Sequence, residues 1–118
     1  MASPEHLSRR HRFQGREAFS AVLSSGKRLH AGDVTLVVSP SAVGISRFGV
    51  AVGRRVSPKA TVRNRLKRVA REAFRRHAAK REGLDLVVLA RAQGAGETQR
   101  WARALGELLD RASKAERP

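Results

Sequence analysis

The sequence predicts a single α+β domain, a sandwich in which helices pack on a small mixed sheet. The chain has 118 residues, a length that suits one domain with one hydrophobic core. Apolar residues recur at helical spacing in three stretches, and β-branched, alternating or continuous apolar stretches lie between them. Their order along the chain is helix, strands, helix, strand, helix, without an internal repeat or a second domain.

The first helix is expected from about Gly15 to Ser24. Ahead of it, residues 1–12 are polar and basic and show little periodicity, which predicts a flexible arm before a single domain at 13–112. Gly26 follows the helix and is a good terminator. The apolar face is formed by residues at i, i+3 and i+4, namely Phe19, Val22 and Leu23.

Strands are expected next. Asp33–Val38 is rich in β-branched residues and is closed by Ser39-Pro40, whereas Arg28–Ala31 is either a short preceding strand or a connection. Phe48–Gly53 alternates strictly, so its large side chains should face the core. Its other face carries only Gly49, Ala51 and Gly53. Either a helix packs closely on this small face or a ligand backbone approaches it.

A strongly basic helix is expected at residues 61–77. This stretch holds seven basic residues and one acid, a net charge of 7 − 1 = +6. Thr61 is the expected N-cap, and Gly83 is expected to end any helix that continues. The apolar face is formed by Val62, Leu66, Val69, Ala70, Ala73 and Phe74, and Asn64, Lys67, Arg68, Arg71 and Arg75 lie opposite.

The last two elements are a buried strand and a helix. Asp85–Ala90 is a nearly continuous apolar run, typical of a strand covered on both faces. The final helix is expected from about Glu97 to Ala112, with Trp101 in the core, and residues 113–118 should form a disordered tail.

The composition points to a polyanionic partner. The formal net charge is +15, and such self-repulsion is best relieved by nucleic acid, where each neutralised phosphate releases counterions. No long apolar span, signal peptide or lipidation motif occurs, so we expect a cytoplasmic protein that does not bind membranes.

The residue types argue against a self-contained enzyme. The chain has no cysteine, which excludes disulfides and thiolate zinc sites. The ten acids are scattered, and the four histidines lack ligand spacing and are expected at the surface: His6, His11, His30 and His77. We therefore assign no catalytic residue and no metal ligand. A basic leucine zipper is rejected because no heptads follow the basic helix.

The ordered motifs resemble the bacterial ribonuclease P protein component. The basic helix carries Arg63-Asn64-Arg65, then Leu66-Lys67-Arg68 and Arg71-Glu72-Ala73-Phe74-Arg75. Upstream, the segment from Arg47 to Arg55 is similar to the family's Arg-x-Gly strand that ends in two basic residues. The first helix and Asp85–Arg91 also fit, so the resemblance covers roughly residues 9 to 111.

The resemblance implies a fold of order αβββαβα with a left-handed crossover. It implies that the protein is the subunit of a ribonucleoprotein endonuclease that removes the 5′ leader from precursor tRNA. The catalytic RNA would carry out the hydrolysis with Mg²⁺ that the RNA mainly holds, and no DNA partner is expected. The alternative is a structural RNA-binding protein such as a ribosomal component, which explains the charge and size but not the ordered motifs.

The resemblance also assigns roles to residues. The expected contacts with the catalytic RNA are Arg63, Asn64, Arg65 and Lys67. The expected leader cleft is bordered by Phe19, Leu23, Val37, Ala51, Arg55, Arg68 and Arg71. Further phosphate contacts are expected at Arg10, Arg12, Arg54, Lys59 and Arg75. Family members often carry aromatic residues at the positions of Leu23 and Val37, so leader binding here should depend more on charge and on Phe19.

Overall fold

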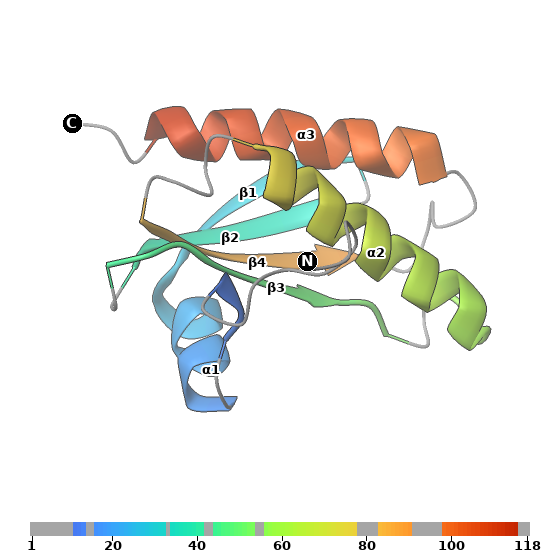
Figure 1. Ribbon diagram of the computed structural model, residues 1–118, viewed down its shortest axis with the longest axis horizontal. Helices are drawn as coiled ribbons and strands as arrows, with labels where there is room; N and C mark the ends of the chain where they lie inside the picture. Colours follow the sequence, from blue (N-terminus) through green and yellow to red (C-terminus); the bar gives the residue numbers. More distant parts are fainter. Residues whose placement is uncertain are drawn as a thin grey trace, which may run out of the picture.

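The computed structural model contains three helices and a four-stranded mixed sheet within its described residues, 11–13, 16–32, 34–41, 44–53, 56–77, 83–90 and 98–115 (Figure 1). The predicted α+β class and the order αβββαβα are confirmed. In chain order the elements are α1 (Arg16–Ser25), β1 (Lys27–Ala31), β2 (Val34–Pro40), β3 (Arg47–Ala51), α2 (Ala60–Arg76), β4 (Leu84–Ala90) and α3 (Thr98–Ala115). The segment before β2 is thus a strand and not merely a connection.

The strands lie in the order β1-β2-β4-β3. β2 pairs antiparallel with both β1 and β4, whereas β3 pairs parallel with β4. The chain therefore crosses from β3 through α2 into the adjacent parallel strand. In the β3/β4 register, Arg47 lies opposite Asp85 and Gly49 lies opposite Val87.

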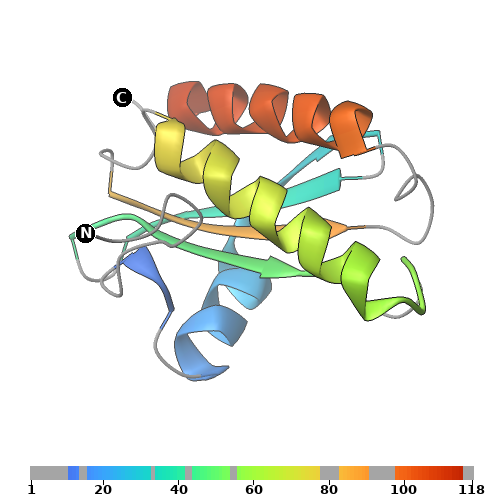
Figure 2. The ribbon, with the colours of Figure 1, turned by 45° about the vertical axis from the view of Figure 1, so that its right-hand side comes forward.

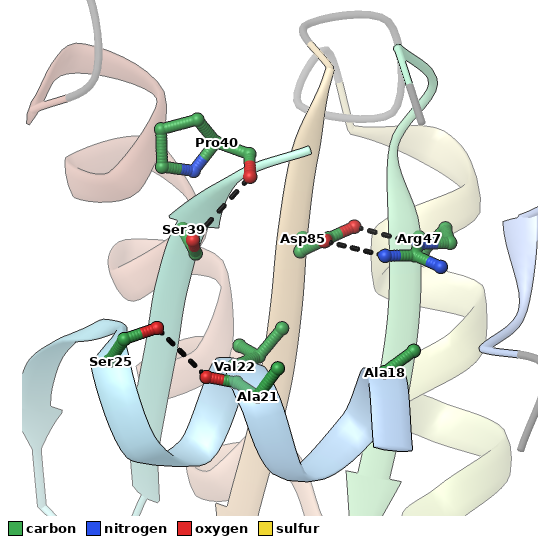
Figure 3. A pocket seen from close by; sticks show the side chains of 8 residues that line it. All are labelled: Ala18, Ala21, Val22, Ser25, Ser39, Pro40, Arg47 and Asp85. Carbon is green, nitrogen blue, oxygen red and sulfur yellow. Dashed lines mark hydrogen bonds and ion pairs between the residues drawn. The ribbon is translucent and has the colours of Figure 1, made fainter. Parts of the chain in front are cut away.

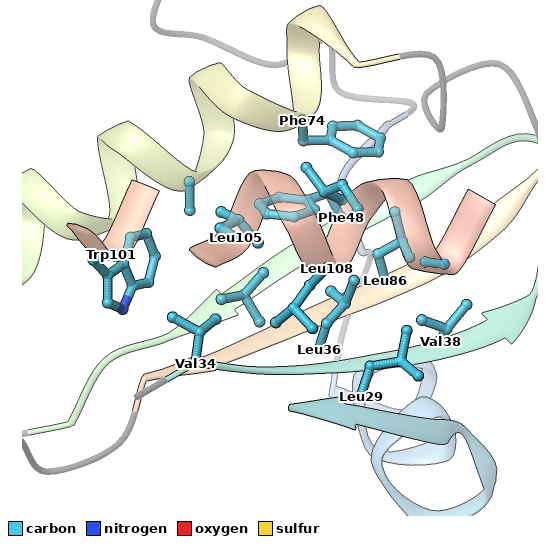
Figure 4. Packing of buried hydrophobic residues seen from close by; sticks show 14 of the residues in the cluster. Leu29, Val34, Leu36, Val38, Phe48, Phe74, Leu86, Trp101, Leu105 and Leu108 are labelled. Carbon is cyan, nitrogen blue, oxygen red and sulfur yellow. The ribbon is translucent and has the colours of Figure 1, made fainter. Parts of the chain in front are cut away.

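The helices cover the two faces of the sheet unequally. α2 and α3 lie side by side on one face, and α1 lies on the other (Figures 1 and 2). The main core fills the space between the sheet and the α2/α3 layer (Figure 4). As predicted, the large side chains of β3 face this core, and Trp101 is buried within it. Under α1 lies a second, smaller cluster of buried Val22, Val37 and Val87.

The predicted N-cap of α2 is wrong, because a local interaction replaces the expected signal. α2 begins at Ala60, and Lys59 is its N-cap residue without a side-chain capping bond. Thr61 is therefore not the N-cap, because a turn at Ser57 starts the helix earlier: the Ser57 hydroxyl accepts a hydrogen bond from the Lys59 backbone N–H at 3.2 Å. α2 ends at Arg76, and Gly83, with a φ of +67°, instead leads into β4.

The two ends of the domain are also more ordered than predicted. α3 continues to Ala115, and Ser113 is buried, so the expected tail does not begin at residue 113. His11 is buried rather than exposed: its Nδ1 lies 2.8 Å from the carbonyl oxygen of Ser46, and its ring meets Phe74 edge-on at 6.4 Å. Arg12 forms an isolated bridge to Phe48 of β3, so the expected arm is fixed at its C-terminal end.

Candidate nucleic-acid interface

The outer face of α2 is cationic because its apolar residues lie on the side that packs against the core. Leu66, Ala70 and Phe74 recur every fourth residue and are buried, which turns the intervening basic residues outward. Asn64, Arg65 and Arg68 are exposed, and Lys67 and Arg71 are half-buried. Within the described ranges, Arg65, Lys67, Arg68 and Arg71 form no hydrogen bond or ion pair. These cations are therefore available to phosphates.

Arg63 differs from its neighbours. It is half-buried, and its Nη1 donates a hydrogen bond to the backbone carbonyl oxygen of Ser57 at 2.9 Å. The bond joins the first turn of α2 to the loop ahead of it. Arg63 is thus partly committed to the structure of the loop, whereas Arg65 is not.

One acid, Glu72, partly neutralises the C-terminal end of α2. The carboxylate of Glu72 accepts two hydrogen bonds from Arg75, at 2.6 and 3.0 Å, and lies 2.7 Å from Nε of Arg76. The hydrogen bonds from Arg75, helped by the charges of Arg75 and Arg76, lower the pKa of Glu72. Arg75, an expected phosphate contact, is therefore held by a carboxylate, and the unbalanced charge lies in the N-terminal part of the helix.

Two cations of α2 lie on the side of the helix that carries Phe74. Lys67, Arg71 and Phe74 are spaced by four and three residues, so they lie on the same side of the helix. The ring of Phe74 stacks on Phe48 of the edge strand β3, with centroids 4.7 Å apart. Lys67 and Arg71 are half-buried on this side of the helix, whereas Arg65 and Arg68 are exposed.

A groove lies on the opposite face of the sheet, beside α1. It encloses about 560 Å³ and is lined by Phe13, Arg16, Phe19, Ser20 and Leu23. The rings of Phe13 and Phe19 meet edge to face, with centroids 5.8 Å apart and an interplanar angle of 81°. Two residues expected at the leader cleft, Phe19 and Leu23, are thus brought together, and Phe13 joins them.

The small face of β3 explains how these rings fit. A Cβ added to Gly49 would lie 2.7 Å from Cε2 of Phe19 and 3.0 Å from Cδ2 of Phe13. Phe19 of α1 and Phe13 before it therefore pack so closely on Gly49 that no larger residue fits there. Of the two explanations for the small face, close packing by a helix thus applies at Gly49. A Cβ at Gly53 would meet nothing within 4 Å, so the packing does not extend to that end of the face.

The structure separates the remaining expected cleft residues. Val37 is fully buried beneath α1 and supports the groove without lining it. Ala51 is half-buried on the same face of the sheet as Gly49. Arg68 and Arg71 belong to α2, in the layer across the sheet (Figure 2). Arg12 and Lys59 are exposed, and Arg10, Arg54 and Arg55 lie outside the described residues.

A charged pair that the sequence analysis did not single out lies beneath α1. Arg47 donates from Nε and Nη2 to the two carboxylate oxygens of Asp85, at 3.0 and 2.8 Å, within a second hollow of about 380 Å³ (Figure 3). The hydrogen bonds to Asp85 raise the pKa of Arg47. The sequence does show opposite charges near the starts of two apolar strands, Arg47 in β3 and Asp85 in β4. Nothing near either residue indicates that these strands pair in parallel, so the ion pair could not be predicted.

The described part of the chain also lacks features of two other classes of protein. No group of three or more histidine or acidic side chains gathers there in a way that could hold a metal ion. No helix in that part is both long enough and apolar enough to cross a membrane.

The α+β fold with the cationic face of α2 defines a small basic protein of the RNA-binding class. A family model described as Ribonuclease P matches residues 7–113 of the sequence. The chain therefore belongs to the ribonuclease P protein family, as its motifs indicated.

Individual relatives agree with this assignment. The chain is similar to the ribonuclease P protein components of Desulfovibrio desulfuricans (38% identity, covering 87% of this chain and 81% of the relative) and Nitrosomonas europaea (40%, 70% and 69%). A match to the Microcystis aeruginosa component reaches 46% identity but spans 58% of that protein. Among solved structures, the RNase P protein from Thermotoga maritima is 31% identical, with a TM-score of 0.72 over 85% of this chain and 96% of that one.

Proposed function

We propose that this protein is the RNA-binding subunit of ribonuclease P, the ribonucleoprotein endonuclease that removes the 5′ leader from precursor tRNA. The observation that carries the proposal is the N-terminal half of α2. It begins with Arg63-Asn64-Arg65, it contains five cations and no acid between residues 63 and 71, and most of these cations lack a partner among the described residues. Phosphate oxygens supply the missing partners.

Two surfaces would serve two RNAs. Arg63, Asn64 and Arg65 at the start of α2 bind the catalytic RNA, where arginine forks bridge phosphates and Asn64 contacts a sugar or a base. The groove beside α1 binds the single-stranded leader, because Phe19 offers a ring on which an unpaired base can stack. Lys67 and Arg71, on the Phe74 side of α2, would bind phosphates of the leader backbone.

Hydrolysis is assigned to the catalytic RNA, with the Mg²⁺ that this family's reaction uses. The scarcity of clustered ligands supports this division, since no group of three or more histidine or acidic side chains forms among the described residues. We derive no catalytic step from the protein. Its contribution is binding energy that raises substrate affinity and lets the RNA function at low Mg²⁺, and it acts in the cytoplasm, where precursor tRNA is processed.

The test is cleavage of a precursor tRNA at low Mg²⁺ by catalytic RNA alone, protein alone and the mixture. Cleavage that needs both components supports the proposal. Cleavage by the protein alone would overturn the assignment of chemistry to the RNA. RNA binding without stimulation of cleavage would instead favour a structural RNA-binding protein.

A further inference from the structure

The groove beside α1 is connected to a buried ion pair on the other side of the same helix. Arg47 and Asp85 lie opposite each other on the paired strands β3 and β4. Their side chains are only 11% and 4% exposed, and two parallel hydrogen bonds fix the guanidinium plane (Figure 3). Because loss of either partner would leave an uncompensated buried charge, this geometry is strongly constrained.

The fixed guanidinium supports an aromatic ring. Its central carbon, Cζ of Arg47, lies 4.9 Å from the centroid of Phe13, within the range of a cation–π contact. Phe13 precedes α1 and is only half-buried. The ion pair therefore adds a contact that helps to position this ring, beside the bridge from Arg12 to Phe48.

Phe13 in turn determines where Phe19 can lie. The two rings meet edge to face, and both rest on the backbone of Gly49, where even a methyl group would collide with them. The contacts thus form a series from Asp85 to Arg47, then to Phe13 and finally to Phe19. Only the last two residues of the series line the groove.

We propose that Arg47 and Asp85 are positioning residues for leader binding: through Phe13 they hold the Phe19 ring in the orientation in which the groove accepts an unpaired base. This inference rests on the proposed function. A base would stack on Phe19, and its phosphate would be met by Arg16, which is exposed at the groove and has no ion pair among the described residues. The affinity for the leader then depends on two residues that do not line its site.

Two variants perturb the series at different points. Arg47→Lys keeps a positive charge opposite Asp85 but removes the planar fork and its contact with Phe13. Gly49→Ala leaves the ion pair intact and displaces both rings. Gly106→Ala is the matched control, since the same methyl group on α3 meets nothing within 4 Å.

The measurement is the dissociation constant of the reconstituted holoenzyme for a precursor tRNA and for the same tRNA without its leader. Arg47→Lys and Gly49→Ala should weaken precursor binding at least ~5-fold, as expected for the loss of one stacked base. Binding of the leaderless tRNA should stay at the wild-type value, and Gly106→Ala should change neither. Equal losses for both ligands, or no loss, would overturn the inference, because a scaffold role does not distinguish them.

A double variant tests the path through Phe13. Phe13→Leu alone should reproduce the selective loss, and combining it with Arg47→Lys should add little, since residues in one series are not additive. If the affinity loss of the double variant equals the product of the two single losses, Arg47 acts by a route that does not include Phe13. If Arg47→Lys fails to fold by circular dichroism, Asp85→Asn takes its place, because it weakens the same pair but keeps one oxygen that accepts from Arg47, and the same selective loss is expected. A wild-type holoenzyme that ignores the leader would instead refute the proposed function itself.

Discussion

Arg63 donates a hydrogen bond from Nη1 to the carbonyl oxygen of Ser57 at 2.9 Å, so the first residue of the Arg-Asn-Arg motif also fastens the loop that leads into α2. Arg65, two residues later, is exposed and makes no such bond within the described chain. The two arginines therefore share a proposed ligand but differ in their contribution to the fold. This difference can be measured.

Arg65→Ala should weaken binding of the catalytic RNA and lower the slope of log affinity against log salt by ~1, the value for one lost phosphate contact. Arg63→Ala should do the same and, in addition, lower the free energy of unfolding by about 0.5–1.5 kcal/mol, as expected for one lost hydrogen bond. Salt titrations and thermal melts of both variants provide the comparison. An unchanged slope for Arg65→Ala would remove that residue from the RNA interface.

Arg71→Ala should weaken binding of leader-bearing precursor tRNA more than binding of mature tRNA. The reason is its place beside Lys67 on the Phe74 side of α2, the side proposed to contact the leader backbone, where Arg71 has no partner in the described chain. Arg68→Ala removes the same charge from the outward side of α2 and should show a smaller preference. Competition binding with the two tRNAs measures this, and the same preference in both variants would argue against a directed leader path.

Leu23→Phe should strengthen leader binding by about fivefold or more, because a base stacked on an aromatic ring gains ~1–3 kcal/mol. Leu23 lines the groove, so the added ring has a cavity to enter. Val37→Phe should not act this way: Val37 is fully buried, and overpacking such a site costs ~1–3 kcal/mol of stability. Precursor affinity and thermal melts separate the two effects. A Leu23→Phe variant with no gain would show that leader bases do not reach α1.

Local patterns were sufficient to predict most of the fold. The amphipathic spacing in α2 and the alternation in β3 each depend on neighbours within a few residues, so both were readable before any tertiary contact was known. The same holds for the burial of Trp101 on the apolar face of α3. The N-cap of α2 was missed because Ser57 sets the turn through its own hydroxyl, although Thr61 is the more usual capping residue.

The site was predictable only in part, because its geometry depends on pairing between distant strands. Arg47 and Asp85 are 38 residues apart, and nothing near either one indicates the parallel β3/β4 register that joins them. His11 is likewise buried through the carbonyl of Ser46, 35 residues away. No helical periodicity tells which face of the sheet a helix covers. Phe19 and Arg68 were therefore assigned to one cleft, although α1 and α2 lie on opposite faces of the sheet (Figure 2).

Glu72→Gln should reduce the acid sensitivity of the fold. The folded-state pKa of Glu72 is lowered by Arg75 and Arg76, so its stabilising effect is present above the unfolded pKa of about 4.3 and is lost as the pH falls through the folded pKa. The wild-type protein should therefore lose more unfolding free energy than the variant in this acidic range. The difference should be under about 1 kcal/mol, since partly exposed pairs contribute ~0.2–1 kcal/mol. Denaturant titrations between pH 6 and pH 3, about the range where carboxylates titrate, measure it.

The same substitution should tighten RNA binding at neutral pH. It removes the carboxylate that now holds Arg75 and Arg76, so both guanidinium groups can turn to phosphates, and the salt slope should steepen by up to ~1 for each new contact. Glu107→Gln is the matched control, because it removes one exposed negative charge from α3, away from the cationic face. Tightening confined to Glu72→Gln would establish that the carboxylate limits the interface locally. Equal tightening in both variants would mean that net charge alone sets the affinity, which would contradict the assignment of α2 as the RNA-binding surface.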